Sequence, residues 1–67
     1  MNRNWLKKIR KDAGFTQIKL ADKVGITRQM ISAIEKGAGP HPNTAKKIAA
    51  VLGFEWTRFF EEEKDAG

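Results

Sequence analysis

Residues 16–35 read T-Q-I-K-L-A-D-K-V-G-I-T-R-Q-M-I-S-A-I-E. The stretch predicts two short helices, because its apolar residues recur at helical spacing on both sides of one glycine, Gly25. Glycine is free to adopt the left-handed conformation that reverses a chain at the end of a helix. Thr16 and Thr27 each stand directly before a helix and are the predicted N-caps. The predicted inward faces carry Leu20, Ala21, Val24, Ile31 and Ile34.

The segment before this pair predicts a first amphipathic helix. Its apolar residues follow a helical stripe, and Gly14 is expected to end it. Asn2 or Asn4 is the expected N-cap, because an asparagine side chain can accept a hydrogen bond from the first turn. The stripe consists of Trp5, Leu6, Ile9 and Ala13.

The segment after the pair predicts two further helices. A loop rich in glycine and proline, residues 37–43, comes first. The fourth helix starts either at Pro42, with His41 as its cap, or after Asn43, and Gly53 ends it. Its inward residues are Ile48, Ala49, Val51 and Leu52. A short fifth helix is expected over the aromatic residues Phe54, Trp56, Phe59 and Phe60.

Together these elements predict an all-α fold, a compact five-helix bundle that contains a helix-turn-helix at about residues 16–36. Residues 1–60 are expected to form a single domain, and residues 61–67 an acidic, frayed C-terminal end. A chain of 67 residues buries one small core and has little mass for a deep catalytic pocket. We therefore expect no second domain.

The composition argues against several classes of function. There is no cysteine and a single histidine, His41, so neither a disulfide nor a cysteine-ligated or multi-histidine metal site is expected. No nucleophile–base pair or pair of catalytic carboxylates emerges, which argues against an enzyme. No apolar run approaches the roughly 18 residues that a membrane span needs. We expect no catalytic residues, no metal and no cofactor.

The charge is unevenly divided along the chain. Through residue 53, eleven Lys and Arg stand against three acids, a net charge of +8, whereas the net charge from residue 54 onward is −3. Such a basic body favours a polyanionic partner, most often nucleic acid, with an acidic membrane surface as the alternative. The predicted helices carry apolar residues that face a shared core, and they end at glycines, as in a folded domain. Both features argue against a membrane-surface peptide. Lys7, Lys8 and Lys11 are expected to form a solvated face of the first helix.

Five elements stand in order along the chain: Leu6 with Ile9-Arg10; Phe15-Thr16-Gln17; Leu20-Ala21 with Val24-Gly25-Ile26-Thr27; Ile31-Ser32 with Ile34-Glu35-Lys36-Gly37; and Ile48-Ala49 with Leu52-Gly53. In this order and at these spacings they resemble the Cro/CI-like (XRE-type) helix-turn-helix transcriptional regulators, typified by phage repressors. The likeness covers about residues 4–60. Lys19 departs from it, standing where the family often has an acid, and the loop before the fourth helix is about one residue shorter than the commonest form.

The resemblance implies sequence-specific binding to double-stranded DNA, with the third helix in the major groove. The base-contacting residues would be Thr27, Arg28, Gln29, Ser32 and Ala33, although Ser32 could instead reach a phosphate or make no contact. The phosphate-contacting residues would be Gln17, at the N-terminus of the second helix, together with Lys36 and Asn43. Arg10 and Glu35 match a family position pair that forms a structural ion pair between the first and third helices.

The resemblance also implies a homodimer on a palindromic operator, with the two third helices ~34 Å apart. Trp56, Phe59 and Phe60 are the candidates for the dimer interface, although some of them are expected to close the core instead. The leading interpretation is a cytoplasmic transcriptional repressor, nucleoid-associated when bound to DNA. The alternative is an antitoxin of the same fold, which binds a toxin protein and autoregulates its operon. A toxin or an antirepressor is therefore a possible protein partner, and no membrane partner is expected.

Overall fold

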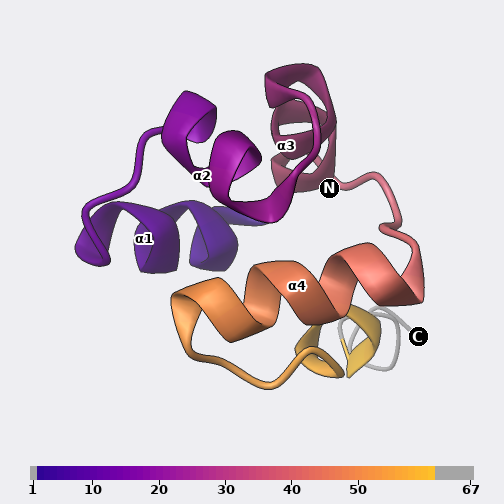
Figure 1. Ribbon diagram of the computed structural model, residues 1–67. Coiled ribbons are helices and arrows are strands. Elements are labelled where there is room, and N and C mark those ends of the chain that lie inside the picture. Colours follow the sequence, from indigo (N-terminus) through magenta and orange to yellow (C-terminus); the bar gives the residue numbers. More distant parts are fainter. Residues whose placement is uncertain (1, 62–67) are drawn as a thin grey trace.

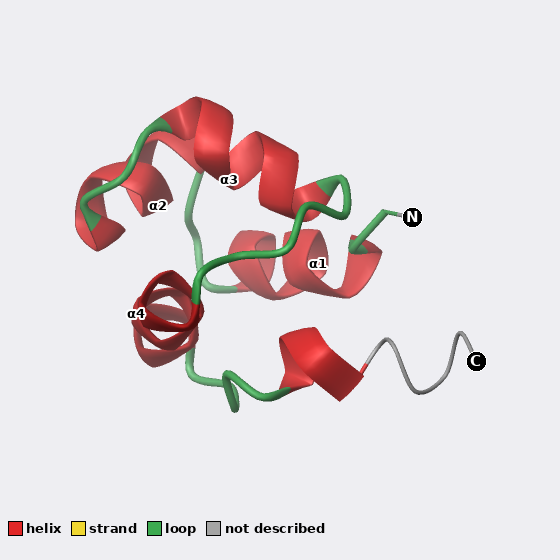
Figure 2. Cartoon of the chain, turned by 90° about the vertical axis from the view of Figure 1, so that its right-hand side faces the viewer, coloured by secondary structure: helices red, strands yellow, loops and turns green. Residues whose placement is uncertain are grey.

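The computed structural model describes residues 2–61. It contains four α-helices, followed by a fifth helical segment that begins at residue 58 and reaches residue 61: α1 (Asn4–Asp12), α2 (Gln17–Val24), α3 (Arg28–Glu35) and α4 (Pro42–Leu52). The predicted all-α fold is confirmed, and the described part of the chain contains no strand. In Figures 1 and 2, α2 and α3 lie together at the top of the molecule, and α4 and the last helical segment lie at the bottom. Most of the predicted acidic end, residues 62–67, lies outside the described residues.

The ends of α2, α3 and α4 agree with the sequence, whereas α1 departs from it. The N-cap of α1 is Arg3 and not Asn2 or Asn4, and no side chain makes a capping hydrogen bond there. The helix ends at Asp12, so Ala13 is exposed and not inward, because the chain already turns at Gly14, whose φ is 84°. The N-cap prediction was wrong because Arg3 is held there by contacts with the end of α3. The prediction for Ala13 was wrong because local hydrogen bonds, from Gly14 to Lys11 and from Phe15 to Arg10, close the helix before it.

The start of α4 resolves the choice that the sequence left open. Pro42 stands in the first turn, where its missing N–H is not needed, and His41 holds the N-cap position without a capping bond from its side chain. Gly53 ends the helix with a φ of 82°. The short loop between α3 and α4 therefore reaches only to His41.

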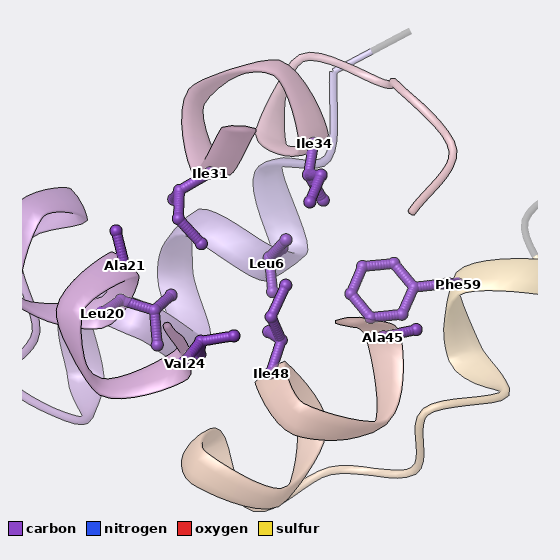
Figure 3. Packing of buried hydrophobic residues seen from close by; sticks show 9 residues of the cluster. All are labelled: Leu6, Leu20, Ala21, Val24, Ile31, Ile34, Ala45, Ile48 and Phe59. Atoms are coloured by element: carbon purple, nitrogen blue, oxygen red, sulfur yellow. The ribbon is translucent and has the colours of Figure 1, made fainter. Parts of the chain in front are cut away.

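One hydrophobic core joins all four helices and the last helical segment. Figure 3 shows side chains from each of these elements converging between α1, α3 and α4. Because four helices contribute aliphatic side chains to this core and the last segment contributes Phe59, the position of α3 depends on every other element. The buried cluster consists of Leu6, Leu20, Ala21, Val24, Ile31, Ile34, Ala45, Ile48 and Phe59.

The C-terminal aromatic residues divide between the core and the surface. The fifth helical segment starts later than predicted. The Phe54 N–H donates to the carbonyl of Ala49 at 3.1 Å and so closes the end of α4, and residues 56–57 form a turn before the segment begins at residue 58. Phe59 is only 2% exposed, and its ring lies 5.4 Å from that of Trp5 and 5.6 Å from that of Phe54. The prediction that Phe59 is available to a dimer interface is therefore wrong. Its ring is already enclosed within one chain.

Candidate DNA interface

The junction of α2 and α3 is built from the capping residues that the sequence predicted. The Thr16 hydroxyl accepts a hydrogen bond from the Lys19 N–H at 3.1 Å, and the Thr27 hydroxyl accepts one from the Met30 N–H at 3.2 Å. Gly25 takes the left-handed conformation, with a φ of 87°, and its N–H donates to the carbonyl of Ala21 at 2.8 Å. The caps and the glycine set two short helices at a fixed angle.

The two faces of α3 differ in exposure. Ile31 and Ile34 point into the core and are 1% and 4% exposed. The predicted base-contacting residues lie away from that face, mostly in the N-terminal half of the helix. Four of them are exposed and the fifth, Ser32, is partly buried; the exposed ones are Thr27, Arg28, Gln29 and Ala33. The structure thus leaves four of the five candidates exposed along or just before α3, and Ser32 is the least accessible.

The three predicted phosphate contacts occupy different positions around this surface. Lys36, directly after α3, and Asn43, in the first turn of α4, are both exposed. Gln17 is partly buried, and its side-chain amide donates to the Glu35 carboxylate at 3.0 Å. That side chain is therefore used within the protein. A phosphate at the start of α2 would be bound by the backbone N–H groups of the first turn, where the helix dipole favours an anion.

A buried ion pair attaches α3 to α1. The Arg10 Nε atom lies 2.5 Å from one Glu35 carboxylate oxygen, and its Nη2 lies 3.4 Å from the other. Arg10 also donates to the carbonyl of Phe15 at 2.8 Å, and Gln17 completes the hydrogen bonding of the carboxylate. Both charged side chains are almost fully buried, at 7% and 2% exposure. The ion pair expected from the sequence is thus part of a network that joins the start of α2 and the end of α3.

Sequence reasoning missed one residue of this region, Arg3. Its side chain is buried, and it donates hydrogen bonds to backbone carbonyls at the end of α3 and in the turn that follows. Nothing in the local sequence marks it, because an arginine before a helix is ordinarily a solvated side chain. Only the packing of the chain's beginning against the end of α3 reveals its role.

Two of the three predicted dimer-interface residues, Trp56 and Phe60, are half-buried or exposed at the end of the molecule opposite α2 and α3 (Figure 1). Phe60 is 38% exposed, and its ring meets that of Trp56 edge to face at 5.5 Å. Trp56 is partly buried, and the ammonium group of Lys46 lies 4.9 Å from the centre of its ring. These two residues stay accessible as interface candidates after Phe59 has been assigned to the core.

Other kinds of site find no support among residues 2–61. No group of three His, Cys, Asp or Glu side chains in this part of the chain is arranged to hold a metal ion. None of the helices described there is both long and apolar enough to cross a membrane.

Two capped helices joined by a glycine turn, the second with a buried apolar face and an exposed polar face, define a helix-turn-helix domain. Comparison with known families agrees, since the helix-turn-helix family model matches residues 6–59. The chain therefore belongs to this family, as its resemblance to the Cro/CI-like (XRE-type) regulators indicated.

The curated relatives carry names of the same kind. The chain is 46% identical over 63 residues to the uncharacterized HTH-type transcriptional regulator YqaF of Bacillus subtilis, an alignment that covers 92% of this chain and 83% of the relative. It is 46% identical over 54 residues to an uncharacterized HTH-type transcriptional regulator of Methanothermobacter thermautotrophicus, covering 79% of this chain and 78% of the relative. No solved structure gives a significant match.

Proposed function

We propose that this protein is a sequence-specific, double-stranded DNA-binding transcriptional regulator that represses by occupying a palindromic operator as a homodimer. The observation that carries the proposal is the outer face of α3. Its polar residues are exposed in the N-terminal half, while its inner face is held by the core and by a buried ion pair. The curated relatives are named as HTH-type transcriptional regulators, which supports the coarser part of the proposal, a regulator of transcription. The proposed site of action is the cytoplasm, at the DNA.

In the proposed complex, α3 lies in the major groove with its first residues at the edges of the bases, as in other helix-turn-helix proteins. Arg28 can donate two hydrogen bonds to guanine O6 and N7, and Gln29 can pair with adenine N6 and N7. The methyl group of Ala33 can contact a thymine methyl group. Thr27 and Ser32 would supply hydroxyl contacts beside them, with Ser32 limited by its partial burial.

Contacts to phosphates would hold α3 in register. The backbone N–H of Gln17 at the start of α2 would bind one phosphate, and Lys36 and Asn43 would reach the backbone from the other side of α3. Such contacts carry no sequence information of their own, but they fix the orientation of the reading helix. Loss of a base contact should therefore change which sequences are bound, whereas loss of a phosphate contact should weaken binding to all sequences alike.

One domain of this size reads one half-site, so we propose a two-fold dimer in which Trp56 and Phe60 contribute to the interface. Phe60 supports this assignment because it is a large exposed aromatic residue beside a second one. Sedimentation at micromolar concentration, with and without a palindromic duplex, tests the dimer. A protein that remains monomeric under both conditions would contradict it.

Selection of bound duplexes from a random DNA library tests the function itself. The wild-type protein is expected to enrich a two-fold symmetric sequence whose half-site centres lie about one helical turn apart. The variant that carries both Arg28→Ala and Gln29→Ala is the matched control, because both residues are exposed and their loss leaves the core intact. It is expected to fold, as shown by circular dichroism, and to enrich no sequence. Failure of the wild-type protein to enrich any sequence would refute sequence-specific binding.

A further inference from the structure

Arg3 is a charged residue buried at the point where the chain's beginning meets the end of α3. It is only 5% exposed, and it precedes the first turn of α1, whose Leu6 and Lys7 N–H groups donate to its carbonyl. Figures 1 and 2 show the beginning of the chain running beside the end of α3. Burial of a guanidinium group is unfavourable unless its donors are paired, so its partners indicate what the burial achieves.

Among residues 2–61, Arg3 donates hydrogen bonds to the carbonyl groups at the end of α3 and in the turn that follows. Its Nη1 atom donates to the carbonyl of Ile34 and to that of Ala38, both at 2.6 Å. Its backbone N–H donates to the carbonyl of Glu35 at 2.7 Å. The guanidinium carbon lies 5.4 Å from the centre of the Phe59 ring, which covers it from the side of the C-terminal segment. One residue thus joins the last turn of α3, the turn that follows and the core.

These contacts suit the end of a helix both electrostatically and geometrically. The last carbonyls of a helix lack partners within the helix and carry the negative end of its dipole, so a cation placed there is stabilising. The bond to Ala38 extends the attachment beyond the helix and restrains the intervening residues, among them Lys36. Glu35 is held twice, through its carbonyl by Arg3 and through its carboxylate by Arg10. Both arginines belong to α1 or its cap, so α3 is attached to α1 at two separate points.

We propose that Arg3 is a positioning residue for DNA recognition. Arg3 fixes the C-terminal end of α3 and the turn through Ala38. It thereby sets the angle at which α3 presents its base-contacting residues, and it also sets the position of Lys36. This inference rests on the proposed function, because it assumes that α3 reads DNA. Contacts that must reach base edges need their supporting groups held within a fraction of an ångström, whereas non-specific attraction to phosphates tolerates looser placement. Loss of Arg3 should therefore reduce specificity more than non-specific affinity.

The test compares Arg3→Met with Arg58→Met. Each substitution removes one positive charge, but Arg58 is exposed and contacts the face of the Trp5 ring at 4.5 Å without touching α3. Affinities are measured for the operator recovered by selection and for a scrambled duplex of equal length, at a temperature where circular dichroism shows each variant folded. Arg58→Met is expected to weaken both complexes to the same extent. Arg3→Met is expected to lower the ratio of operator to scrambled affinity about tenfold, the size of one weakened base contact.

The neutral variant Arg3→Gln provides a second measurement. A single nitrogen, Nη1, donates to the carbonyls of Ile34 and Ala38, and a glutamine amide also carries two donors on one nitrogen. Arg3→Gln is expected to lose part of the specificity ratio, and it replaces Arg3→Met in the comparison if the latter does not fold. Amide exchange of the DNA-free protein supplies an independent readout. The Gly37 and Ala38 amides, bonded to Ile34 and Ala33, should exchange faster in the Arg3 variants, while Val24 remains protected.

Equal ratios of operator to scrambled affinity in the Arg3 and Arg58 variants would overturn the inference, as would unchanged exchange at Gly37 and Ala38. A wild-type protein that does not prefer its selected duplex would instead refute the proposed function. In that case the exchange measurement would still test whether Arg3 holds the end of α3.

Discussion

The buried ion pair between Arg10 and Glu35 leads to a quantitative prediction for Arg10→Met. Methionine fills much of the volume of the arginine side chain but leaves the Glu35 carboxylate, 2% exposed, without a counter-charge. The substitution also removes the hydrogen bond to the carbonyl of Phe15. The amide of Gln17 remains as one donor to the carboxylate. The variant thus converts a paired buried charge into an isolated one.

The expected loss follows from the burial of both groups. Removing one partner of a buried ion pair costs about 3–5 kcal/mol, because the remaining charge is left uncompensated. Since Gln17 still donates to Glu35, the lower end applies, about 3 kcal/mol. A domain of this length is stable by about 3–10 kcal/mol in total, so the variant should be partly or largely unfolded. At about 4–8 °C for each kcal/mol, its Tm should fall by about 12–24 °C.

Urea and thermal unfolding, followed by circular dichroism, measure this loss. Lys8→Met is the matched control, because it breaks the exposed pair between Lys8 and Asp12, whose atoms lie 3.3 Å apart on the surface of the same helix. An exposed pair of this spacing contributes only about 0.3–0.5 kcal/mol. A double variant, Arg10→Met with Glu35→Leu, should recover much of the lost stability because no unpaired charge remains. If Arg10→Met were within about 1 kcal/mol of the Lys8→Met control, the ion pair would not hold α3 on α1 as described.

Four further substitutions test three separate parts of the structure. Lys36→Ala is expected to weaken binding to all duplexes alike and to reduce the salt slope of the binding constant by about 0.9, since one phosphate contact is lost; a loss confined to particular base sequences would argue against that role. Phe59→Ala is expected to lower the free energy of unfolding by about 3–5 kcal/mol, whereas Phe60→Ala should cost about 1 kcal/mol and weaken self-association in sedimentation; similar stability losses would contradict the division between core and surface. Thr16→Ala should cost about 1 kcal/mol in urea unfolding, because the Lys19 N–H loses its cap, and an unchanged midpoint would contradict the capping role.

The features that could be predicted from the sequence are those decided locally. Thr16, Gly25 and Thr27 act within one turn of their own positions, so their residue types suffice to place the ends of α2 and α3. Pro42 fits the start of α4 for the same reason. The spacing of Ile31 and Ile34 marks the inner face of α3 and leaves the opposite face for recognition.

The features that the sequence did not reveal depend on contacts between distant segments. Residue type favours Asn2 or Asn4 as the N-cap of α1. Arg3 takes that position and is buried because its side chain reaches the carbonyls at the end of α3, a contact that the local sequence does not reveal. Phe59 and Phe60 are adjacent in the sequence, so only the packing shows which of them faces the core. The side chain of Gln17 likewise turns toward Glu35 from the next helix, a contact that spacing along the chain does not predict.

The central claim, that the outer face of α3 reads base pairs, is tested most directly by the specificity profile of Arg28→Ala. Binding free energies are measured for the selected operator and for every single base-pair change within it, with the wild-type protein, Arg28→Ala and the exposed control Lys8→Ala. The wild-type protein and the control should share one profile, with a penalty of about 1–3 kcal/mol at the guanine that Arg28 contacts. Arg28→Ala should bind all four base pairs at that position alike and keep its penalties elsewhere. An Arg28→Ala profile that keeps every preference of the wild-type protein would contradict the claim.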